Sequence, residues 1–204
     1  DHPDVCGISI ATRPDCLGIE VLDLLAKLRD EYPDKFLWIE LGLQTIHEDT
    51  ARYIRRGYPL SCFEQACADL KALQIPFIVH TILGLPGETN IQLLQTMDYL
   101  NRIQPFGIKL QLLHVLKGTD LADDYLAGKF EALTFDAYID LVISCLAHLS
   151  PDIVIHRVTG DGPKNLLIAP TWSMNKRGVL NELHHRMKKQ GIRQGDLFPK
   201  DNYS

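Results

Sequence analysis

The residues best suited to chemistry gather in four polar or glycine-rich clusters, each at the end of an apolar run. The clusters combine arginine, carboxylate, amide, histidine and glycine residues, and they occupy positions 9–15, 40–45, 80–88 and 114–119. Arginine binds carboxylates through a two-pronged fork, and glycine lets a ligand approach the backbone because it has no Cβ. In parallel β/α folds, ligands bind at the carboxyl ends of the strands. The clusters therefore predict one ligand site built from several strand ends.

Glu40 and Gln44 stand four residues apart in one apolar run, so in a strand both point to the same face. A carboxylate inside a barrel needs a partner, because an unpaired buried charge is costly. Arg13 and Lys109 are the candidate partners. Glu40 is thus either a ligand-facing group or one half of a structural ion pair.

Four further features each allow a functional and a structural interpretation. Residues 84–88 (GLPGE) form a turn that either admits a ligand or only begins a helix with a favourable acidic residue. Arg55 and Arg56 are either anion-binding residues or a solvated helix end. His80, inside an apolar strand, is either a ligand contact or a satisfied core residue. Residues 156–162 (HRVTGDG) either line a substrate entrance or form a capped turn, and no catalytic group can be chosen among them.

Around these clusters, β-branched apolar runs alternate with segments of helical period, which is typical of βα units on a parallel sheet. Strands are expected over residues 5–11, 37–44, 77–83, 107–115 and 153–158, and helices over 15–32, 48–55, 61–74, 90–103, 135–149 and 176–189. Ser61 and Glu64 are expected to form a capping box. Crossover connections place successive strands side by side. The sequence thus predicts an α/β fold: a partial (β/α) barrel with parallel strands over residues 1–150, and a C-terminal extension over residues 151–204 with a strand, a helix and a loose tail after Gly191.

The composition excludes several classes of protein. The 204 residues are 46% apolar and 23% charged, which is ordinary for a globular domain. A net charge of −5 argues against a nucleic-acid interface over the whole surface, although a local basic patch is compatible with it. No apolar run approaches the roughly 18–20 residues that span a bilayer, so no membrane association is expected. The five cysteines are odd in number and scattered, which favours a reducing, cytoplasmic location.

Four motifs in order carry a resemblance to a known family: ATRPD (11–15), ELGLQT (40–45), RRGY (55–58) and HTILGLPGE (80–88). Over residues 4–181 the chain resembles the Elp3-like branch of the radical S-adenosylmethionine (radical SAM) enzymes, and within it the YhcC/YtqA-type group. The resemblance implies the second half of a radical SAM barrel, with S-adenosylmethionine and a [4Fe-4S] cluster as cofactors. It also implies reductive cleavage of S-adenosylmethionine to a 5′-deoxyadenosyl radical that abstracts hydrogen from a substrate. The implied partners are tRNA, modified at a wobble uridine, and an electron donor such as flavodoxin or ferredoxin.

The resemblance implies roles for single residues as well. The residue at position 44 reaches the cofactor, the one at position 56 contacts its methionine moiety, His80 faces the ribose, and the GLPGE turn lies beside the adenine. The implied cofactor-binding residues are Gln44, Arg56, His80, Gly84, Val115 and Arg13. The implied substrate-binding residues are His156, Arg157 and Asp161.

One feature of the family is missing. Radical SAM chemistry uses three cysteine thiolates, commonly in the pattern CxxxCxxC, and none of the five cysteines has that spacing. Cys62 and Cys67 are interpreted as small apolar residues of a helix. No metal ligand is therefore expected in this chain. The cluster ligands are expected upstream of Asp1, and the chain alone is expected to be inactive.

Two rival interpretations remain open. The first is a non-redox domain that uses the half-barrel to bind a nucleotide or a partner protein. The second is a phosphate-binding barrel enzyme such as an aldolase, which needs a lysine at a strand end for its Schiff base. Lys109 lies inside the expected strand, so the aldolase is the weaker rival.

Overall fold

The computed structural model describes residues 2–160 and 162–199. The strands are β1 (Gly7–Thr12), β2 (Phe36–Gln44), β3 (Phe77–Leu83), β4 (Gly107–Leu112), β5 (Val115–Leu116), β6 (Val154–Arg157) and β7 (Leu167–Ala169). The helices are α1 (Ile19–Glu31), α2 (Glu48–Tyr53), α3 (Leu60–Ala72), α4 (Asn90–Ile103), α5 (Asp120–Leu126), α6 (Phe135–His148) and α7 (Lys176–Gln190), with short 3-10 helices at Pro14–Cys16 and Thr171–Met174. Within the described residues, no helix is both long and apolar enough to cross a membrane.

Five strands form one parallel sheet in the order β1-β2-β3-β4-β6. The predicted arrangement, four parallel strands adjacent in chain order, is confirmed, and β6 adds a fifth. Parallel pairing requires a crossover between neighbours, and helices provide it here. The carboxyl ends of these strands therefore open toward one rim.

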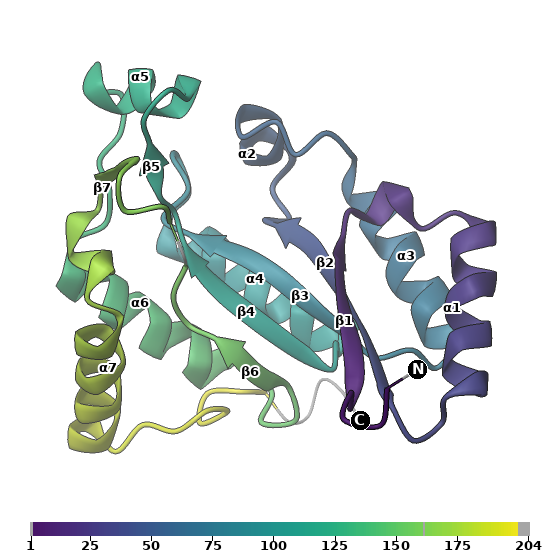
Figure 1. Ribbon diagram of the computed structural model, residues 1–204. Coiled ribbons are helices and arrows are strands. Elements are labelled where there is room, and N and C mark those ends of the chain that lie inside the picture. The colour runs from purple at the N-terminus through teal and green to yellow at the C-terminus, as the bar shows by residue number, and fades with distance from the viewer. Residues whose placement is uncertain (1, 161, 200–204) are drawn as a thin grey trace.

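The two faces of this sheet have different surroundings. Helices α1, α3, α4 and α6 cover one face, whereas the other face, toward the viewer in Figure 1, carries no helix of the described chain. Strand β2 alternates accordingly: Leu37, Ile39, Leu41 and Leu43 are buried, and Trp38, Glu40, Gly42 and Gln44, which alternate with them, are partly exposed on the open face. A period of two thus gives the strand an apolar side for packing and, toward its carboxyl end, a polar side for a site.

A second, smaller unit rises from the carboxyl end of β4. Strands β5 and β7 pair antiparallel, and Val115, Ala122 and Ala169 form a separate small apolar cluster between them and α5. Figure 1 shows α5 at the top of this unit, beyond the carboxyl ends of the main strands. The prediction of one continuous strand over residues 107–115 is therefore wrong. The Leu113 N–H still donates to the Leu83 carbonyl, but the chain then leaves the main sheet to pair with β7.

The starts of α3 and α4 differ in how their first N–H groups are satisfied: by another helix in α3 and by the helix's own residues in α4. The capping box expected from Ser61 and Glu64 is wrong, because α3 begins at Leu60, whose N–H donates to the Glu48 carboxylate at 2.7 Å. A side chain of α2 thus replaces the local cap. Helix α4 begins with its own capping box at Thr89, and its predicted bounds are confirmed.

The segment after α7 is anchored against the end of α6. The N–H groups of Gly195 and Leu197 donate to two carbonyls in the last turn of that helix, and the Gln194 side chain donates to two carbonyls just beyond it. These bonds satisfy carbonyls that a helix end leaves open. The loose tail expected after Gly191 is therefore wrong for residues 192–198.

Candidate functional site

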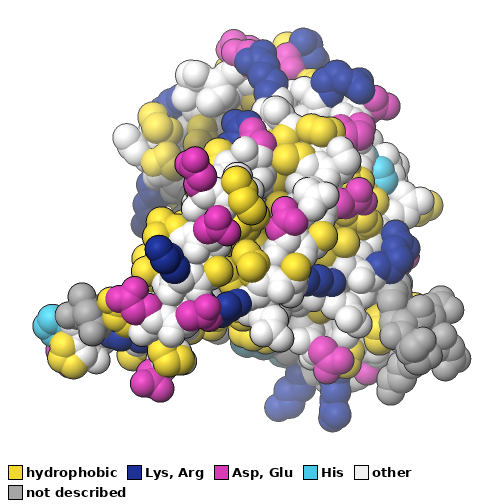
Figure 2. Space-filling model, turned by 90° about the vertical axis from the view of Figure 1, so that its right-hand side faces the viewer, with side chains coloured by type: hydrophobic (Ala, Val, Ile, Leu, Met, Phe, Trp, Pro, Cys, Tyr) yellow, Lys and Arg dark blue, Asp and Glu magenta, His cyan; other side chains and the backbone are white. Residues whose placement is uncertain are grey.

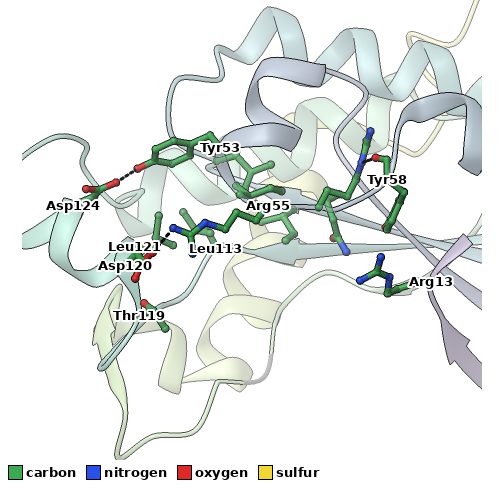
Figure 3. A pocket seen from close by; sticks show the side chains of 14 residues that line it. Arg13, Tyr53, Arg55, Tyr58, Leu113, Thr119, Asp120, Leu121 and Asp124 are labelled. Atoms are coloured by element: carbon green, nitrogen blue, oxygen red, sulfur yellow. Dashed lines mark hydrogen bonds and ion pairs between the residues drawn. The ribbon is translucent and has the colours of Figure 1, made fainter. Parts of the chain in front are cut away.

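A cavity of about 710 Å³ opens at the carboxyl ends of the main strands. Its walls come from the ends of β2 and β3, the loop after β1, the segment around α2, the link after β4, and α5 (Figure 3). We call this cavity the rim pocket. Arg13, Gln44 and Arg56 of the predicted cofactor-binding set line it. The structure thus brings these three residues together at one cavity, and their role in binding a cofactor stays a prediction.

Gln44 lines the pocket in an uncommon backbone conformation. Its φ is +65°, in the left-handed region that non-glycine residues rarely adopt, and it lies at a register shift between β2 and β3. A Cβ on Gly42 would lie 2.8 Å from Gln44 Nε2, so glycine at position 42 leaves room for the amide. Strain of this kind costs about 1–3 kcal/mol and is concentrated at binding sites.

Arg56 is buried, and the protein itself uses most of its guanidinium. Nε donates to the Tyr58 carbonyl (2.9 Å), Nη1 to the Thr45 carbonyl (2.7 Å), and Nη2 to Glu48 Oε1 (2.8 Å). Only 1% of the Arg56 side chain is exposed. Because a guanidinium has five N–H donors, few remain for a ligand. The cofactor contact implied for Arg56 stays a prediction, and the geometry assigns it the positioning of the segment after β2.

Arg13 supplies the more accessible charge on the same wall. Its side chain is 56% exposed and pairs with Asp15 at 2.6 Å. The guanidinium carbons of Arg13 and Arg56 lie 5.4 and 5.2 Å from the centroid of the Tyr58 ring, within range of cation–π attraction. The Tyr58 hydroxyl donates to the carbonyl of Gly42. Tyr58 therefore holds two arginines beside the pocket, a role for which its place in RRGY is the only signal in the sequence.

The opposite wall of the pocket is acidic and belongs to α5. Figure 3 shows Tyr53 and Arg55 reaching across to it. The Tyr53 hydroxyl donates to Asp124 at 2.6 Å, and Arg55 pairs with Asp120. Of these four residues, sequence reasoning singles out only Arg55, as a candidate anion-binding residue. The acidic residues in the first turn of α5 are the one local sequence feature that could have indicated the acidic wall. The two links join segments that are 71 and 65 residues apart in the chain.

Deeper on the open face, a group of side chains surrounds Glu40, and we call it the Glu40 cluster. The Glu40 carboxylate accepts hydrogen bonds from Ser9 Oγ (2.8 Å), His80 Nε2 (2.6 Å) and Lys109 Nζ. Gln111 Nε2 lies 2.7 Å from His80 Nδ1. Of the two partners predicted for Glu40, the lysine is therefore the one it has.

His80 belongs to this cluster and not to the wall of the rim pocket. It pairs in register with Gly42, and it lies on the same face as Ile82, which lines the pocket together with Gln44. Gln44 and His80 thus share one face, as predicted, but at different depths. Both ring nitrogens of His80 already have protein partners. Its implied contact with the cofactor ribose stays a prediction.

Burial and hydrogen bonding set the charges of the Glu40 cluster. Burial disfavours the Glu40 carboxylate, but hydrogen bonds from Lys109, Ser9 and His80 outweigh burial and lower its pKa to about 2. Burial lowers the pKa of His80, and the hydrogen bond to Glu40 opposes this only in part. At neutral pH the cluster therefore combines a carboxylate at Glu40 with a neutral imidazole at His80.

His156 and Arg157 lie apart from the rim pocket. The His156 ring packs against Trp38 and Phe106, with centroid distances of 5.4 and 5.7 Å, toward the amino ends of the strands. Both predicted residues line a separate hollow of about 470 Å³ between β6 and α7. Asp161 lies outside the described residues. The substrate-binding role implied for this segment stays a prediction, and the structure does not bring it to the rim pocket.

Gly84 and Val115 are not among the residues that line the rim pocket. Val115 is fully buried in the small apolar cluster. Gly84 has a φ of +82°, and a Cβ there would lie 2.8 Å from the Leu133 side chain, so this turn requires glycine. Their cofactor contacts stay predictions. The apolar surface that faces the pocket comes instead from Ile82, Leu85 and Leu113.

The described cysteines are not arranged as ligands of an iron–sulfur cluster. Cys67 and Cys145 are buried, and burial raises the pKa of each thiol to about 12, whereas a metal ligand must be a thiolate. Among residues 2–160 and 162–199, no group of three His, Cys, Asp or Glu side chains is placed to hold a metal ion. The described residues therefore form a pocket but present no group arranged to ligate a cluster.

A partial β/α barrel with a ligand pocket at its strand ends is the class of protein that this geometry defines. Two family models match consecutive parts of the chain: the Radical SAM superfamily over residues 2–100, and the Radical_SAM C-terminal domain over residues 105–189. The chain belongs to the radical SAM superfamily.

Individual relatives agree with this assignment. YtqA of Bacillus subtilis is 43% identical over 195 residues, which are 96% of this chain and 60% of YtqA. Human Elongator complex protein 3 is 28% identical over 196 residues, 94% of this chain and 34% of that protein. The archaeal Methanocaldococcus infernus Elp3, with an N-terminal deletion, superposes with a TM-score of 0.79 at 19% identity and covers 93% of this chain and 43% of its own, which supports the fold. The chain thus spans about 60% of the length of YtqA.

Proposed function

We propose that this chain is the carboxy-terminal part of a radical SAM catalytic core and that it binds S-adenosylmethionine in the rim pocket. The observation that carries the proposal is the convergence of three motifs on one cavity: Arg13 of ATRPD, Gln44 of ELGLQT and Ile82 of HTILGLPGE. The volume of about 710 Å³ is in the range of small-molecule sites, roughly 300–1,000 Å³.

The walls of the pocket suit a nucleoside joined to an amino acid. Ile82, Leu85 and Leu113 offer apolar surface to a flat ring. Arg13 offers an accessible guanidinium to a carboxylate, and the Gln44 amide offers both a donor and an acceptor to hydroxyl groups. Arg56 keeps the segment after β2 in place, so that these groups face one cavity.

Bound beside a reduced [4Fe-4S] cluster, S-adenosylmethionine supplies a 5′-deoxyadenosyl radical for hydrogen abstraction. The residues of this chain take the tasks of binding the cofactor, orienting it and shielding it from water. Because the described residues offer no cluster ligands, we propose that the chain alone forms no 5′-deoxyadenosine after anaerobic treatment with iron and sulfide.

The substrate and partners are proposed from resemblance to the Elp3-like branch. We propose a tRNA nucleoside as substrate, flavodoxin or ferredoxin as electron donor, and a cytoplasmic location. The reaction is then that of an oxidoreductase or transferase.

Binding of S-adenosylhomocysteine, followed by NMR of the labelled chain, tests the cofactor assignment. Resonances of the rim pocket should shift, with a Kd on the order of 0.1–1 mM because no cluster anchors the amino-acid part. Gln44→Ala should weaken binding about 3- to 10-fold through the loss of a hydrogen bond. Gln104→Ala is the matched control, because Gln104 also has a positive φ but caps α4. Shifts confined to the hollow at His156 would contradict the proposal.

The non-redox nucleotide-binding domain is the alternative that the structure favours next, because the described residues lack cluster ligands while the pocket suits a nucleotide. Adenosine monophosphate distinguishes the two proposals. A radical SAM pocket should bind it more weakly than S-adenosylhomocysteine, because the amino-acid part is absent. Equal affinity for the two ligands would favour the alternative.

A further inference from the structure

Helix α5 forms one wall of the rim pocket, but little apolar packing holds it there. Residues 119–121 and Asp124 line the pocket. Of the seven residues of α5, Ala122 alone is buried, and Leu126 is 71% exposed. Helix α6, in contrast, buries eight of its fourteen residues. Because apolar burial is the main force that keeps a helix in place, α5 is weakly attached.

The small unit that carries α5 has an apolar cluster of its own. Val115, Ala122 and Ala169 are the buried residues of this cluster, and Tyr125 and Phe130 pack against them. The cluster is separate from the main core, which contains the buried residues of the parallel sheet and of the helices that cover it. A movement of α5 therefore leaves the main core closed.

A glycine with a positive φ stands on each side of α5. Gly118 (φ +77°) precedes the helix, and Gly128 (φ +73°) follows it. A Cβ at either position would meet no non-neighbouring atom within 4 Å, so the backbone conformation is what favours glycine there, and not a lack of space. Hinges consist of a few residues at the ends of an element that absorb changes in φ and ψ. The two glycines are placed where a hinge for α5 must lie.

Two polar links hold α5 against the opposite wall of the pocket, and we call them the latch (Figure 3). The Tyr53 hydroxyl donates to Asp124 at 2.6 Å. Arg55 pairs with Asp120, and these two side chains are 77% and 72% exposed. Exposed ion pairs are weak, because water and salt compete for the charges. Asp124 also pairs with Lys129 of its own unit at 2.6 Å, so it keeps a partner when the latch opens.

The wall on the other side of the latch is fixed. Arg56 is buried and donates to the Thr45 and Tyr58 carbonyls, which anchors the segment after α2. The neighbouring Arg55 has a φ of +54°, a conformation that non-glycine residues rarely adopt. Its side chain extends across the pocket to α5, whereas that of Arg56 lies inside the protein. The segment after α2 is therefore the fixed side of the latch, and α5 is the movable side.

Exposed charges by themselves do not indicate a movable helix, as the flank formed by α1 and α3 shows. Acidic, basic and apolar side chains are interspersed on this flank in Figure 2. Both helices nevertheless pack into the main core, α1 through Leu22 and Leu25 and α3 through four buried residues. Helix α5 differs because its exposed links accompany weak packing, two flanking glycines and a place at the pocket.

We propose that α5 is a lid of the rim pocket, which turns about Gly118 and Gly128 and is held closed by the latch. The open lid admits a ligand to the cavity of about 710 Å³, and the closed lid covers the ligand and excludes water. The identity of the ligand, S-adenosylmethionine, rests on the proposed function. The lid itself follows from the packing, the exposure and the flanking residues of α5.

Hydrogen–deuterium exchange followed by mass spectrometry tests the lid. In the parent chain, amides of residues 121–128 should exchange faster than those of α6. Arg55→Glu places a negative charge opposite Asp120 and should speed exchange in this segment about three- to tenfold. Arg55→Glu with Asp120→Arg restores opposite charges and should return exchange to near the parental rate. Arg52→Glu is the matched control and should have no effect on this segment, because Arg52 pairs with Asp49 within α2.

S-adenosylhomocysteine connects the lid to the pocket. Its binding should slow exchange in residues 121–128, because a ligand that contacts the closed lid favours the closed state. Its dissociation, measured by NMR line shapes, should be about three- to tenfold faster from Arg55→Glu than from the parent. The double variant Arg55→Glu with Asp120→Arg should release it at near the parental rate.

Three results of the exchange measurement would overturn the proposal. These are exchange in α5 as slow as in α6 in the parent chain, equal acceleration by Arg55→Glu and Arg52→Glu, and no recovery in the double variant. The exchange measurement on the free chain needs no ligand, so the lid and the proposed function are tested separately. Absence of S-adenosylhomocysteine binding would contradict only the cofactor assignment, whereas binding without slower exchange in α5 would contradict only the lid.

Discussion

On the covered face of the main sheet, Leu41 and Val79 are fully buried among apolar side chains, whereas their neighbours Glu40 and His80 bond to each other on the open face. The same strands therefore serve two purposes. Apolar packing on one side supplies stability that is insensitive to pH. The other side holds charged groups whose burial is costly unless they are paired. Because neighbouring residues of a strand point to opposite faces, residues that stabilise the fold alternate with residues of the Glu40 cluster along the same strands.

The largest effect should come from the covered face. Leu41→Ala should lower the free energy of unfolding by about 2–5 kcal/mol, because it removes transfer energy and leaves a cavity. Ile82→Ala, on the half-buried open face, should cost less than half as much. Urea denaturation of both variants measures the difference. Equal losses would mean that the open face is packed as tightly as the core.

Replacing each of two neighbouring arginines of the rim pocket should change the free energy of unfolding by different, smaller amounts. Arg56→Ala should cost about 2–3 kcal/mol, because it leaves the Thr45 and Tyr58 carbonyls without their charged donor. Arg55→Ala should cost less than about 0.5 kcal/mol, since its side chain is 77% exposed. Thermal and urea unfolding are the measurements. If Arg55→Ala were the more harmful change, the positioning role of Arg56 would be wrong.

The smallest effect is the pH dependence of the Glu40 cluster. The folded pKa of Glu40 is about 2, below its ordinary 4.5, so its stabilisation is complete above pH 4.5 and is lost as the pH falls toward 2. The lowered pKa of His80 acts in the same direction and begins below its ordinary 6.5. The shift from 4.5 to about 2 corresponds to at most about 3 kcal/mol, and Glu40→Gln, whose amide oxygen still accepts a hydrogen bond, should cost about 2 kcal/mol at pH 7, with a difference from the parent that shrinks below pH 4.5.

Urea unfolding of the parent and Glu40→Gln across this pH range gives the comparison. Exposed Glu131, changed to Gln, is the control and should follow the parent at every pH. A constant difference between Glu40→Gln and the parent down to pH 3 would contradict the lowered pKa of Glu40.

Helices whose caps and apolar period lie within their own residues could be predicted from the sequence. The predicted bounds of α4 are confirmed, because its capping box and helical period are encoded within the helix. The sequence predicts a start of α3 at Ser61, but the helix begins at Leu60 because Glu48 of another helix accepts a hydrogen bond from the Leu60 N–H. The β5–β7 pair cannot be predicted, because two very short strands have no period of their own and exist only through pairing.

The candidate site divides in the same way. Gln44 and Arg13 could be found, because strand ends of a parallel sheet share one rim. The resemblance implies a cofactor contact for Arg56, whereas its bonds to the Tyr58 and Thr45 carbonyls exist only in the folded loop. Asp120 and Asp124 could not be selected, because only folding brings them opposite Tyr53 and Arg55.

The sequence by itself determined the alternation of strands and helices, the family, and the polar strand ends, because each is encoded by residues a few positions apart. The tertiary structure alone decided which charges pair and which stay accessible. Glu40 meets a lysine 69 residues away, and Arg55 meets an aspartate 65 residues away. Such pairings depend on burial and on distances between distant segments, and neither quantity exists in an unfolded chain.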